Sequence, residues 1–362
     1  MKAVVLVGGT GTRLRPLTLT VPKQVLPIVN VPMIERVLAY LAGHGIDEAV
    51  LSLGYLHGAF EDLFPDGRAG AVRLTYAVEP EPLDTAGAVG FAARLAGIDE
   101  RFLVVNGDVL TDLDVTAMVA FHDERGAQAT ISLTEVADPS AFGLVPIDAD
   151  GKVEAFVEKP APGTVGAALI NAGTYVLEPS VLDHIPEGRR VSIEREVFPA
   201  LAAAGTVYGF ASRAYWTDTG TPLQYLQAQV DLVTGARPGP LVAGAMPTPA
   251  GVWTTGETDA DPETQGPAVV GAGASVGHGA SIVGSVIGPG CQVHPGARVL
   301  ESVLLAGAVV GKGALVSRSI LGRAAQVGEG AELTGLCVLG EGYVVEPGAR
   351  LDGLRLPAAD GS

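Results

Sequence analysis

The sequence predicts a two-domain protein, in which an α/β domain with a mostly parallel sheet is followed by a parallel β-helix. Short apolar segments alternate with helical patterns over residues 1–232, and a stretch rich in glycine and proline occupies 233–266. A six-residue repeat then covers most of 267–356. A chain of 362 residues is also longer than one typical core supports, which favours two domains.

The first domain alternates strand-like and helix-like segments, as βαβ units do. Apolar segments typical of strands cover 3–7, 48–53, 73–77, 101–105 and 129–134, and helical patterns cover 33–42 and 85–95. The alternation predicts a sheet whose ligand site lies beyond the carboxyl ends of its strands. A glycine loop follows the first of these segments, and Asn106-Gly107-Asp108 follows the fourth.

The second half of the chain has a different pattern. Residues 233–266 contain many helix and strand breakers and little periodicity, which predicts a linker. Beyond them an aliphatic residue followed by glycine returns about every six positions, as in Val270-Gly271 and Val310-Gly311. Such a period is typical of a parallel β-helix with aliphatic side chains stacked inside. The open end of a stack needs a cap or a partner, and we expect a homo-oligomer formed through this domain.

The composition limits the partners and the compartment. A formal net charge of −17 argues against nucleic acid and against an anionic membrane surface. The first residues have no secretion-signal pattern, and no apolar run reaches the roughly 18 residues that a membrane span requires. We therefore expect a cytoplasmic protein. The two cysteines, Cys291 and Cys337, lie among small and apolar residues, which predicts buried thiols.

The glycine loop at 7–16 is the most informative local feature. Gly8, Gly9 and Gly11 have no Cβ atom, so backbone N–H groups can surround an anion, and Arg13 adds a planar positive charge. The loop lacks the Gly-Lys-Ser/Thr of a Walker A motif, and Leu14 replaces the third glycine of the dinucleotide fingerprint. It predicts a site for a phosphate chain, with a glycine-rich turn that binds no ligand as the alternative.

The residues that follow extend this loop into a longer motif. Residues 8–23 read G-G-x-G-T-R-L-x-P-L-T-x-x-x-P-K, which resembles the signature of the nucleotidyltransferases that make nucleotide-activated sugars. The resemblance covers residues 1–230 and continues into the repeat. Within this family the chain is most similar to the branch that joins GTP to mannose 1-phosphate, on the evidence of residues 79–87 and the repeat. The resemblance implies a Rossmann-like sheet and a left-handed β-helix.

Nucleotidyl transfer brings together two anions that repel each other. The site must therefore supply cations, a divalent metal ion and carboxylates that hold it. The resemblance implies that Arg13 and Lys23 stabilise the transferring and leaving phosphates and that Asp108 and Asp218 hold Mg²⁺. An isolated aspartate before a turn is more often a cap or part of an Asx turn, so the metal assignment depends on the presence of both acidic motifs.

The other site assignments also come from the resemblance. The residues implied to bind the nucleotide are Leu6, Gly8, Gly9, Thr10, Gly11, Thr12, Glu79, Asp84, Thr85, Gly87, Asn106 and Gly107. The residues implied to bind the sugar phosphate are Gly143, Glu158, Lys159 and Asn171. Lys159 would hold the phosphate, Glu158 would accept hydrogen bonds from hydroxyls, and Asn171 offers both a donor and an acceptor.

Asp84 departs from the pattern of that branch. It stands where a glycine is common, just before the predicted helix at 85–95. Its carboxylate either caps this helix or accepts hydrogen bonds from N1–H and the exocyclic amine of guanine.

Other functions remain open from the sequence. The sugar phosphate could be glucose 1-phosphate or a pseudo-sugar phosphate, with dTTP or ATP as the nucleotide. A regulatory subunit without turnover is a second alternative, although such a subunit could lose the cationic or acidic residues that are all present here. An acyltransferase that uses His278 or His294 is a third, and a structural role for these histidines is favoured.

Overall fold

The structure is a computed structural model that describes residues 1–54, 56–158, 166–237, 245–248, 250–260, 264 and 266–358, with Glu158 described in its backbone alone. By their contacts, the residues form two compact bodies. The first contains residues 1–9 and 34–217, and the second contains residues 10–33 and 218–362. Residues 10–33, here called the phosphate segment, therefore belong to the body that holds the repeat.

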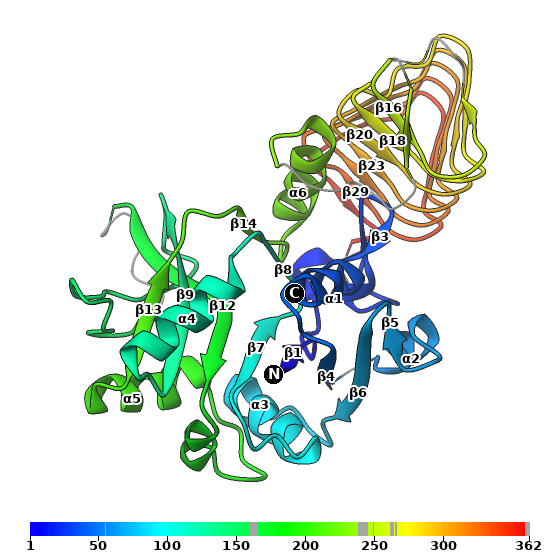
Figure 1. Ribbon diagram of the computed structural model, residues 1–362. Coiled ribbons are helices and arrows are strands. Elements are labelled where there is room, and N and C mark those ends of the chain that lie inside the picture. Colours follow the sequence, from blue (N-terminus) through cyan, green and yellow to red (C-terminus); the bar gives the residue numbers. More distant parts are fainter. Residues whose placement is uncertain are drawn as a thin grey trace. The chain divides into compact units, whose positions relative to one another are not determined.

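The first body is built on a mixed sheet with a parallel centre (Figure 1). Its strands are β1 (Lys2–Leu6), β4 (Glu48–Leu53), β5 (Arg68–Ala69), β6 (Val72–Val78), β7 (Phe102–Asn106), β9 (Ala129–Val136), β10 (Gly143–Leu144), β11 (Val157–Glu158), β12 (Ala168–Leu177) and β13 (Val207–Ala211). Their order is β11-β10-β12-β7-β1-β4-β6-β5, and β9 pairs with both β12 and β13. Strands β7, β1, β4 and β6 are parallel, whereas β12 is antiparallel to β7 and β9. Two further short strands pair with each other, β8 (Val109–Thr111) and β14 (Trp216–Asp218).

The helices that accompany this sheet begin and end at recognisable signals. They are α1 (Met33–Gly43), α2 (Gly58–Leu63), α3 (Asp84–Leu95), α4 (Val115–Arg125) and α5 (Phe198–Ala204), with a 3₁₀ helix, η3 (Pro179–His184), and a π-helical turn, η4 (Ile193–Val197). At the start of α4 the Asp114 carboxylate accepts a hydrogen bond from the Ala117 N–H at 2.9 Å, and Gly126 ends the helix with a φ of 56°. The helices predicted at 33–42 and 85–95 are confirmed as α1 and α3.

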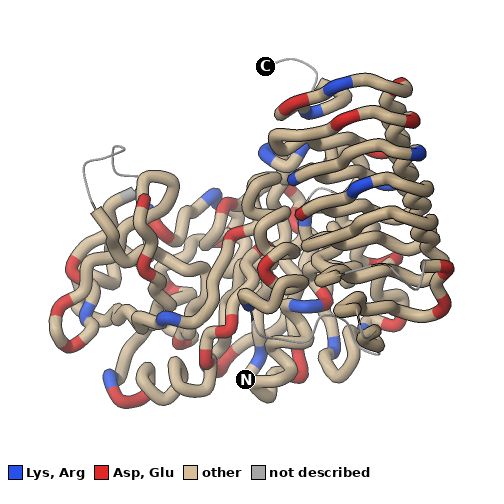
Figure 2. Tube along the Cα trace, turned by 90° about the horizontal axis from the view of Figure 1, so that it is seen from above, with Lys and Arg blue, Asp and Glu red and all other residues tan. Residues whose placement is uncertain are grey.

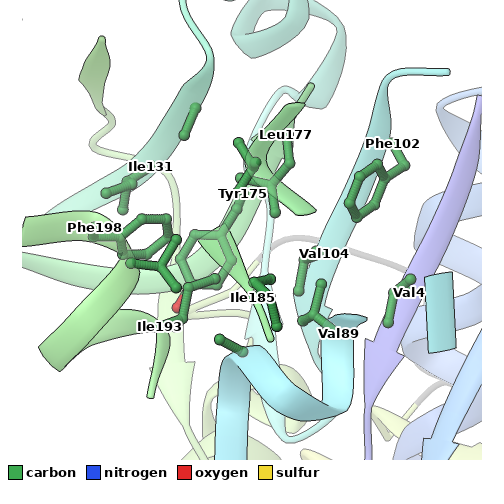
Figure 3. Packing of buried hydrophobic residues seen from close by; sticks show 14 of the residues in the cluster. Val4, Val89, Phe102, Val104, Ile131, Tyr175, Leu177, Ile185, Ile193 and Phe198 are labelled. Atoms are coloured by element: carbon green, nitrogen blue, oxygen red, sulfur yellow. The ribbon is translucent and has the colours of Figure 1, made fainter. Parts of the chain in front are cut away.

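The core of the first body lies between this sheet and the helices (Figure 3). Tyr175 on β12 packs edge-on against Phe198 of α5, with ring centroids 5.0 Å apart. Val4 on β1 and Val104 on β7 are fully buried in the same cluster. The central strands β1 and β7 are covered on both faces, so their residues are mostly apolar and buried, and this is why they stood out in the sequence.

The repeat folds into a parallel β-helix with three sheets, as predicted (Figure 1). The first sheet contains β15 (Met246–Pro247), β16 (Val252–Thr254), β18 (Ala268–Val270), β20 (Ser285–Ile287), β23 (Val303–Leu304), β26 (Ile320–Leu321), β29 (Val338–Leu339) and β32 (Arg355–Leu356). The second contains β17 (Asp259–Ala260), β19 (Ser275–Val276), β21 (Gln292–Val293), β24 (Val309–Val310), β27 (Gln326–Val327) and β30 (Val344–Val345). The third contains β22 (Arg298–Leu300), β25 (Leu315–Ser317), β28 (Glu332–Thr334) and β31 (Arg350–Asp352). The parallel sheets are consistent with a left-handed β-helix.

Aliphatic side chains fill the interior of the β-helix. Charged residues are spread over its successive coils (Figure 2). Cys291 and Cys337 are buried, as the sequence predicted. Burial raises the pKa of the Cys291 thiol to about 11. None of the described helices has the length and apolar character needed to cross a bilayer.

Buried side chains also connect successive coils at one corner of the β-helix. The backbone N–H of Ser302 donates to the Ser285 hydroxyl at 3.1 Å, and the N–H of Ser319 donates to the Ser302 hydroxyl at 3.1 Å. The N–H of Cys337 donates to the Ser319 hydroxyl at 3.2 Å. This serine ladder satisfies one buried N–H group on each coil and fixes the register between coils.

The phosphate segment packs with the β-helix through a hairpin. The segment contains two 3₁₀ turns, η1 (Thr12–Leu14) and η2 (Lys23–Val25), and the hairpin strands β2 (Pro27–Ile28) and β3 (Val31–Pro32). At the tip, Val29 and Asn30 both have positive φ, 48° and 60°. The Val29 N–H donates to Gln229 of α6 (Pro222–Thr234) at 3.0 Å, and the Asn30 amide donates to the Ile287 carbonyl of β20 at 3.0 Å.

We predict that Ser302→Ala destabilises the β-helix. The substitution leaves the buried Ser319 N–H without its acceptor, which costs about 1–3 kcal/mol in the free energy of unfolding. Urea unfolding of the full chain measures this loss. Ser317→Ala, on the next coil and half-buried, is the control, and equal effects of the two substitutions would contradict a role for the ladder.

Candidate active site

The carboxyl ends of β1 and β7 meet at a position where only glycine fits. The Gly107 N–H donates to the Leu6 carbonyl at 2.9 Å. A Cβ atom on Gly107 would lie 2.5 Å from Cγ1 of Val7 and 3.0 Å from the Leu6 carbonyl oxygen. The two predicted loops, at the end of β1 and at the end of β7, therefore lie against each other at the edge of the sheet, as expected for a ligand site of this fold.

Glu79 stands beside the start of the glycine loop. Its carboxylate accepts hydrogen bonds from the Ser52 hydroxyl at 3.1 Å and from the Leu83 N–H at 3.0 Å. A Cβ atom on Gly8 would lie 3.3 Å from Oε1 of this carboxylate. The structure thus brings two of the predicted nucleotide residues, Gly8 and Glu79, into contact.

A polar pocket of about 340 Å³ lies in the first body. Four of its lining residues were predicted as site residues, namely Asp84, Asn106, Gly143 and Asn171. The sequence assigned no role to the others, which are Ala141, Phe142, Phe156, Ser192, Glu194 and Arg195. Ser192, Glu194 and Arg195 lie within the residues 1–230 that the resemblance covers, but the resemblance implied no role for them.

Asn171 is held in the pocket by two hydrogen bonds. Its amide donates to the Tyr175 hydroxyl at 2.9 Å, and its carbonyl oxygen accepts from the Gly173 N–H at 3.0 Å. Burial raises the pKa of Tyr175, so the hydroxyl stays protonated at neutral pH. Asn171 retains capacity for one more donated and one more accepted hydrogen bond, which suits a ligand with hydroxyl groups.

Thr85 and Gly87, both on α3, contact the turn η4 and the residues that precede it. The Thr85 hydroxyl donates to Glu194 at 2.8 Å and accepts from the Ile193 N–H at 2.8 Å. Gly87 is buried, and a Cβ atom there would lie 2.8 Å from the Arg189 carbonyl oxygen. Thr85 and Gly87 therefore support the wall of the polar pocket, which Glu194 lines.

Asp84 is the first residue of α3, and Leu83 occupies the N-cap position. The Asp84 carboxylate accepts from the adjacent Thr85 N–H at 2.8 Å and forms an ion pair with Arg195 at 2.9 Å. The carboxylate therefore bonds an N–H group at the start of α3, one residue along the chain rather than the two or three of a usual N-cap.

In the second body the phosphate segment makes a tight turn around Gly11. Gly11 has a φ of 64°, and its carbonyl accepts from the Thr18 hydroxyl at 2.7 Å. A Cβ atom on Gly11 would lie 3.3 Å from Cβ of Lys23. The turn thus brings the backbone at Gly11 next to Lys23.

Arg13 lies near the predicted metal ligand Asp218. Their nearest side-chain atoms are 3.7 Å apart, and the Arg13 side chain is 61% exposed whereas that of Asp218 is 17% exposed. A Cβ atom on Gly220 would lie 2.5 Å from Nη2 of Arg13, so this glycine leaves room for the guanidinium. An exposed guanidinium next to a half-buried carboxylate is available to a phosphate.

The last coils of the β-helix also hold the phosphate segment. The Arg355 guanidinium donates to the Arg13 carbonyl at 3.1 Å, and the Thr20 hydroxyl donates to Glu341 at 3.0 Å. Between the segment and the coils lies a pocket of about 240 Å³ with a mainly aliphatic lining. Its chemistry does not suit phosphate groups.

The remaining predicted residues are divided between the two bodies. Gly9 and Asp108 belong to the first, and Thr10 and Thr12 belong to the second. The backbone of Glu158 pairs with that of Gly143 across β10 and β11. Lys159 lies outside the described residues.

Comparison with known proteins identifies the family. A family model described as nucleotidyl transferase matches residues 2–235. The chain belongs to the nucleotidyl transferase family. A second model, described as the GMPPB C-terminal domain, matches residues 264–357. This nucleotidyl transferase is therefore an enzyme, and the reaction class inferred from the loop motif is confirmed.

The nucleotidyl transferase is similar to curated enzymes from several kingdoms. It is 41% identical over 288 residues to a mannose-1-phosphate guanylyltransferase from Mycobacterium tuberculosis, a match that covers 78% of this chain and 79% of that protein. It is 42% identical over 230 residues to a mannose-1-phosphate guanyltransferase from Schizosaccharomyces pombe, covering 62% of each.

Solved structures are similar to part of this chain. The crystal structure of HddC from Yersinia pseudotuberculosis is 30% identical, with a TM-score of 0.56, and the match covers 63% of this chain and 97% of that one. A second structure of HddC, in complex with GMP-PN, matches with a TM-score of 0.55 at 30% identity over the same shares of the two chains.

We predict that Gly107→Ala damages the edge of the sheet. The new methyl group would overlap the Val7 side chain, and overpacking of this kind costs about 1–3 kcal/mol. Thermal unfolding measures the loss, and Val7→Ala in the same chain should recover part of it. Gly43→Ala at the end of α1, where a Cβ atom meets nothing within 4 Å, is the control. A Gly107→Ala protein as stable as this control would contradict the prediction.

Proposed function

We propose that the protein transfers a guanylyl group from GTP to mannose 1-phosphate and releases pyrophosphate. The similarity to the mannose-1-phosphate guanylyltransferase of M. tuberculosis carries the proposal, because it extends over 78% of this chain. The complex of HddC with GMP-PN, a guanine-type ligand by its name, favours a guanine nucleotide on the same fold.

The reaction exchanges one phosphoanhydride bond for another. An oxygen of the sugar phosphate attacks the α-phosphorus of GTP, the bond from the α-phosphorus to the bridging oxygen breaks, and pyrophosphate leaves with the electron pair. No protein nucleophile is needed. We assign to the backbone N–H groups of residues 8–12 and to Arg13 and Lys23 the neutralisation of the phosphates, since attack requires both anions to be screened.

Family members of this kind use a divalent metal ion, and we propose Mg²⁺ held by Asp108 and Asp218. No group of three or more His, Cys, Asp or Glu residues among those described could hold a metal alone. Two carboxylates nevertheless fit Mg²⁺, which usually binds through one or two carboxylates together with phosphate oxygens of the substrate. When bound, the ion supplies positive charge to the phosphates.

We assign the sugar phosphate to the polar pocket of the first body. Asn106 and Asn171 offer amide groups for sugar hydroxyls, and Phe142 and Phe156 offer apolar surface for the ring carbons. The rings of Phe142 and Trp216 pack edge to face with centroids 5.6 Å apart, so Phe142 has little freedom to move. Glu158 and Lys159 remain proposed ligands of the sugar and its phosphate.

The domain boundaries and the assembly are also proposals. We place the catalytic domain at 1–232, the linker at 233–266 and the β-helix at 267–356, and the family models at 2–235 and 264–357 support these limits. We propose a homo-oligomer formed through the β-helix, since its end coils expose aliphatic residues such as Val344, 54% exposed, and Leu354, 44% exposed.

An assay of pyrophosphate release tests the proposed function. GTP, ATP, dTTP, CTP and UTP are each combined with mannose, glucose and galactose 1-phosphates. We expect the highest kcat/KM for GTP with mannose 1-phosphate, and chelation of divalent metal should abolish turnover. A highest value for any other pair would replace the assignment, and no release in any combination would refute it.

We predict that Arg355→Ala weakens catalysis from a distance. A hydrogen bond from a charged donor contributes about 1.5–3 kcal/mol, so loss of the Arg355 contact should lower kcat about tenfold through displacement of Arg13. The KM for mannose 1-phosphate should change less than about twofold, because the Arg355 guanidinium donates to the phosphate segment and does not line the polar pocket. Arg350→Ala breaks an ion pair with Glu332 on the neighbouring strand β28 and is the control. Equal kcat values for the two variants would contradict this role.

A further inference from the structure

Asp84 holds a backbone conformation that does not suit its side chain. Its φ is 63°, in the left-handed region that glycine adopts without strain. Aspartate tolerates this region better than most residues but still loses stability there. Residues in such conformations cluster at ligand sites, where the surrounding structure holds them in place. A side-chain function at position 84 would explain why the chain has aspartate here.

Both oxygens of the Asp84 carboxylate have partners. Oδ1 accepts from the Thr85 N–H at 2.8 Å, and Oδ2 forms an ion pair with Nη2 of Arg195 at 2.9 Å. Arg195 lies 111 residues later, on η4. A carboxylate has about four lone-pair sites, so Asp84 keeps capacity for a further donor while it holds Arg195.

The ion pair belongs to a larger set of contacts between α3 and η4. Glu194 accepts from the Thr85 hydroxyl at 2.8 Å and from the Ser192 hydroxyl at 3.0 Å. The Ser192 hydroxyl in turn accepts from the Arg195 N–H at 3.2 Å. The backbone of η4 is therefore fixed independently of the Asp84 carboxylate. The ion pair in addition restricts the position of the Arg195 side chain.

The pair lines the pocket that we assign to the sugar phosphate. Asp84, Glu194 and Arg195 share this pocket with Asn171 and Gly143. The Arg195 side chain is 64% exposed, whereas that of Asp84 is 24% exposed, so the carboxylate forms the fixed member of the pair. A guanidinium has five N–H donors in a rigid fork, and the one contact to Asp84 leaves donors for a ligand.

We propose that Asp84 and Arg195 act as one unit that determines which sugar 1-phosphate the pocket accepts. Asp84 is a positioning residue that fixes the Arg195 guanidinium at the pocket wall, and Arg195 donates hydrogen bonds to sugar hydroxyls. A site built to bond a particular hydroxyl rejects sugars that present it elsewhere, because the polar groups of the site then lose their partner. This inference rests on the proposed function and deepens it.

The test compares Asp84→Gly, Arg195→Ala and the double variant. Glycine suits the positive φ, so Asp84→Gly should be at least as stable as the wild type in thermal unfolding, and a fall in activity cannot be attributed to misfolding. At saturating GTP, we expect the ratio of kcat/KM for mannose 1-phosphate to that for glucose 1-phosphate to fall at least about tenfold in each single variant. The double variant should fall no further, since the two residues act together. The KM for GTP should stay within about twofold.

Arg189→Ala is the matched control. Arg189 pairs with Glu196 on the same turn but does not line the pocket, so its loss should leave the sugar preference unchanged. Arg195→Lys should restore part of the preference because it retains the charge without the fork.

Other outcomes would overturn the inference. Equal losses with both sugar phosphates, or additive effects in the double variant, would mean that the pair does not set sugar preference. A loss confined to GTP among the triphosphates would assign Asp84 to guanine instead. If the wild type turns over no sugar phosphate, the proposed function fails, and calorimetric titration of mannose 1-phosphate and glucose 1-phosphate into wild type and Asp84→Gly then decides the inference by their affinity ratio.

Discussion

The hairpin at 27–32 is the contact on which the geometry of the phosphate segment depends. Its tip has two residues with positive φ, and Val29 is β-branched, so the turn is strained and persists because of its tertiary contacts. Those contacts are the hydrogen bonds from Val29 to Gln229 and from Asn30 to Ile287, together with one from the Tyr225 hydroxyl to the Pro27 carbonyl at 2.6 Å. Arg13 and Lys23 belong to the same segment, so α6 and the β-helix help to define where their backbone lies.

In the first body, by contrast, the polar pocket is formed by the sheet and its helices. Its sheet brings together the ends of β1 and β7, where glycine at position 107 permits contact between loops. Its pocket is formed by residues far apart in sequence, from Asp84 to Arg195. Rigid strands and helices therefore carry the polar groups, which suits a reaction that requires fixed charges rather than a protein nucleophile.

Much of this organisation could be predicted from the sequence. The strand at 48–53 and the helices at 33–42 and 85–95 were found because apolar residues recur with the period of each element, and the β-helix was found from its repeat. The contacts of the phosphate segment with Ile287, Glu341 and Arg355 could not be predicted, because they join residues more than 250 positions apart. The pairing of Asp84 with Arg195 was missed because the two residues lie 111 positions apart, although a position where glycine is common is consistent with the positive φ found at Asp84.

The serine ladder also bears on how the length of the β-helix can change. Its members repeat every 17 or 18 residues, so an insertion or deletion keeps the stacking only if it comprises a whole coil. Each coil adds about 4.8 Å along the axis. Removal of one coil between Ile287 and Arg355 would shift the guanidinium away from the Arg13 carbonyl by that distance while the Asn30 anchor stayed in place. The number of coils between Ile287 and Arg355 thus sets the distance between the two points at which the β-helix contacts the phosphate segment.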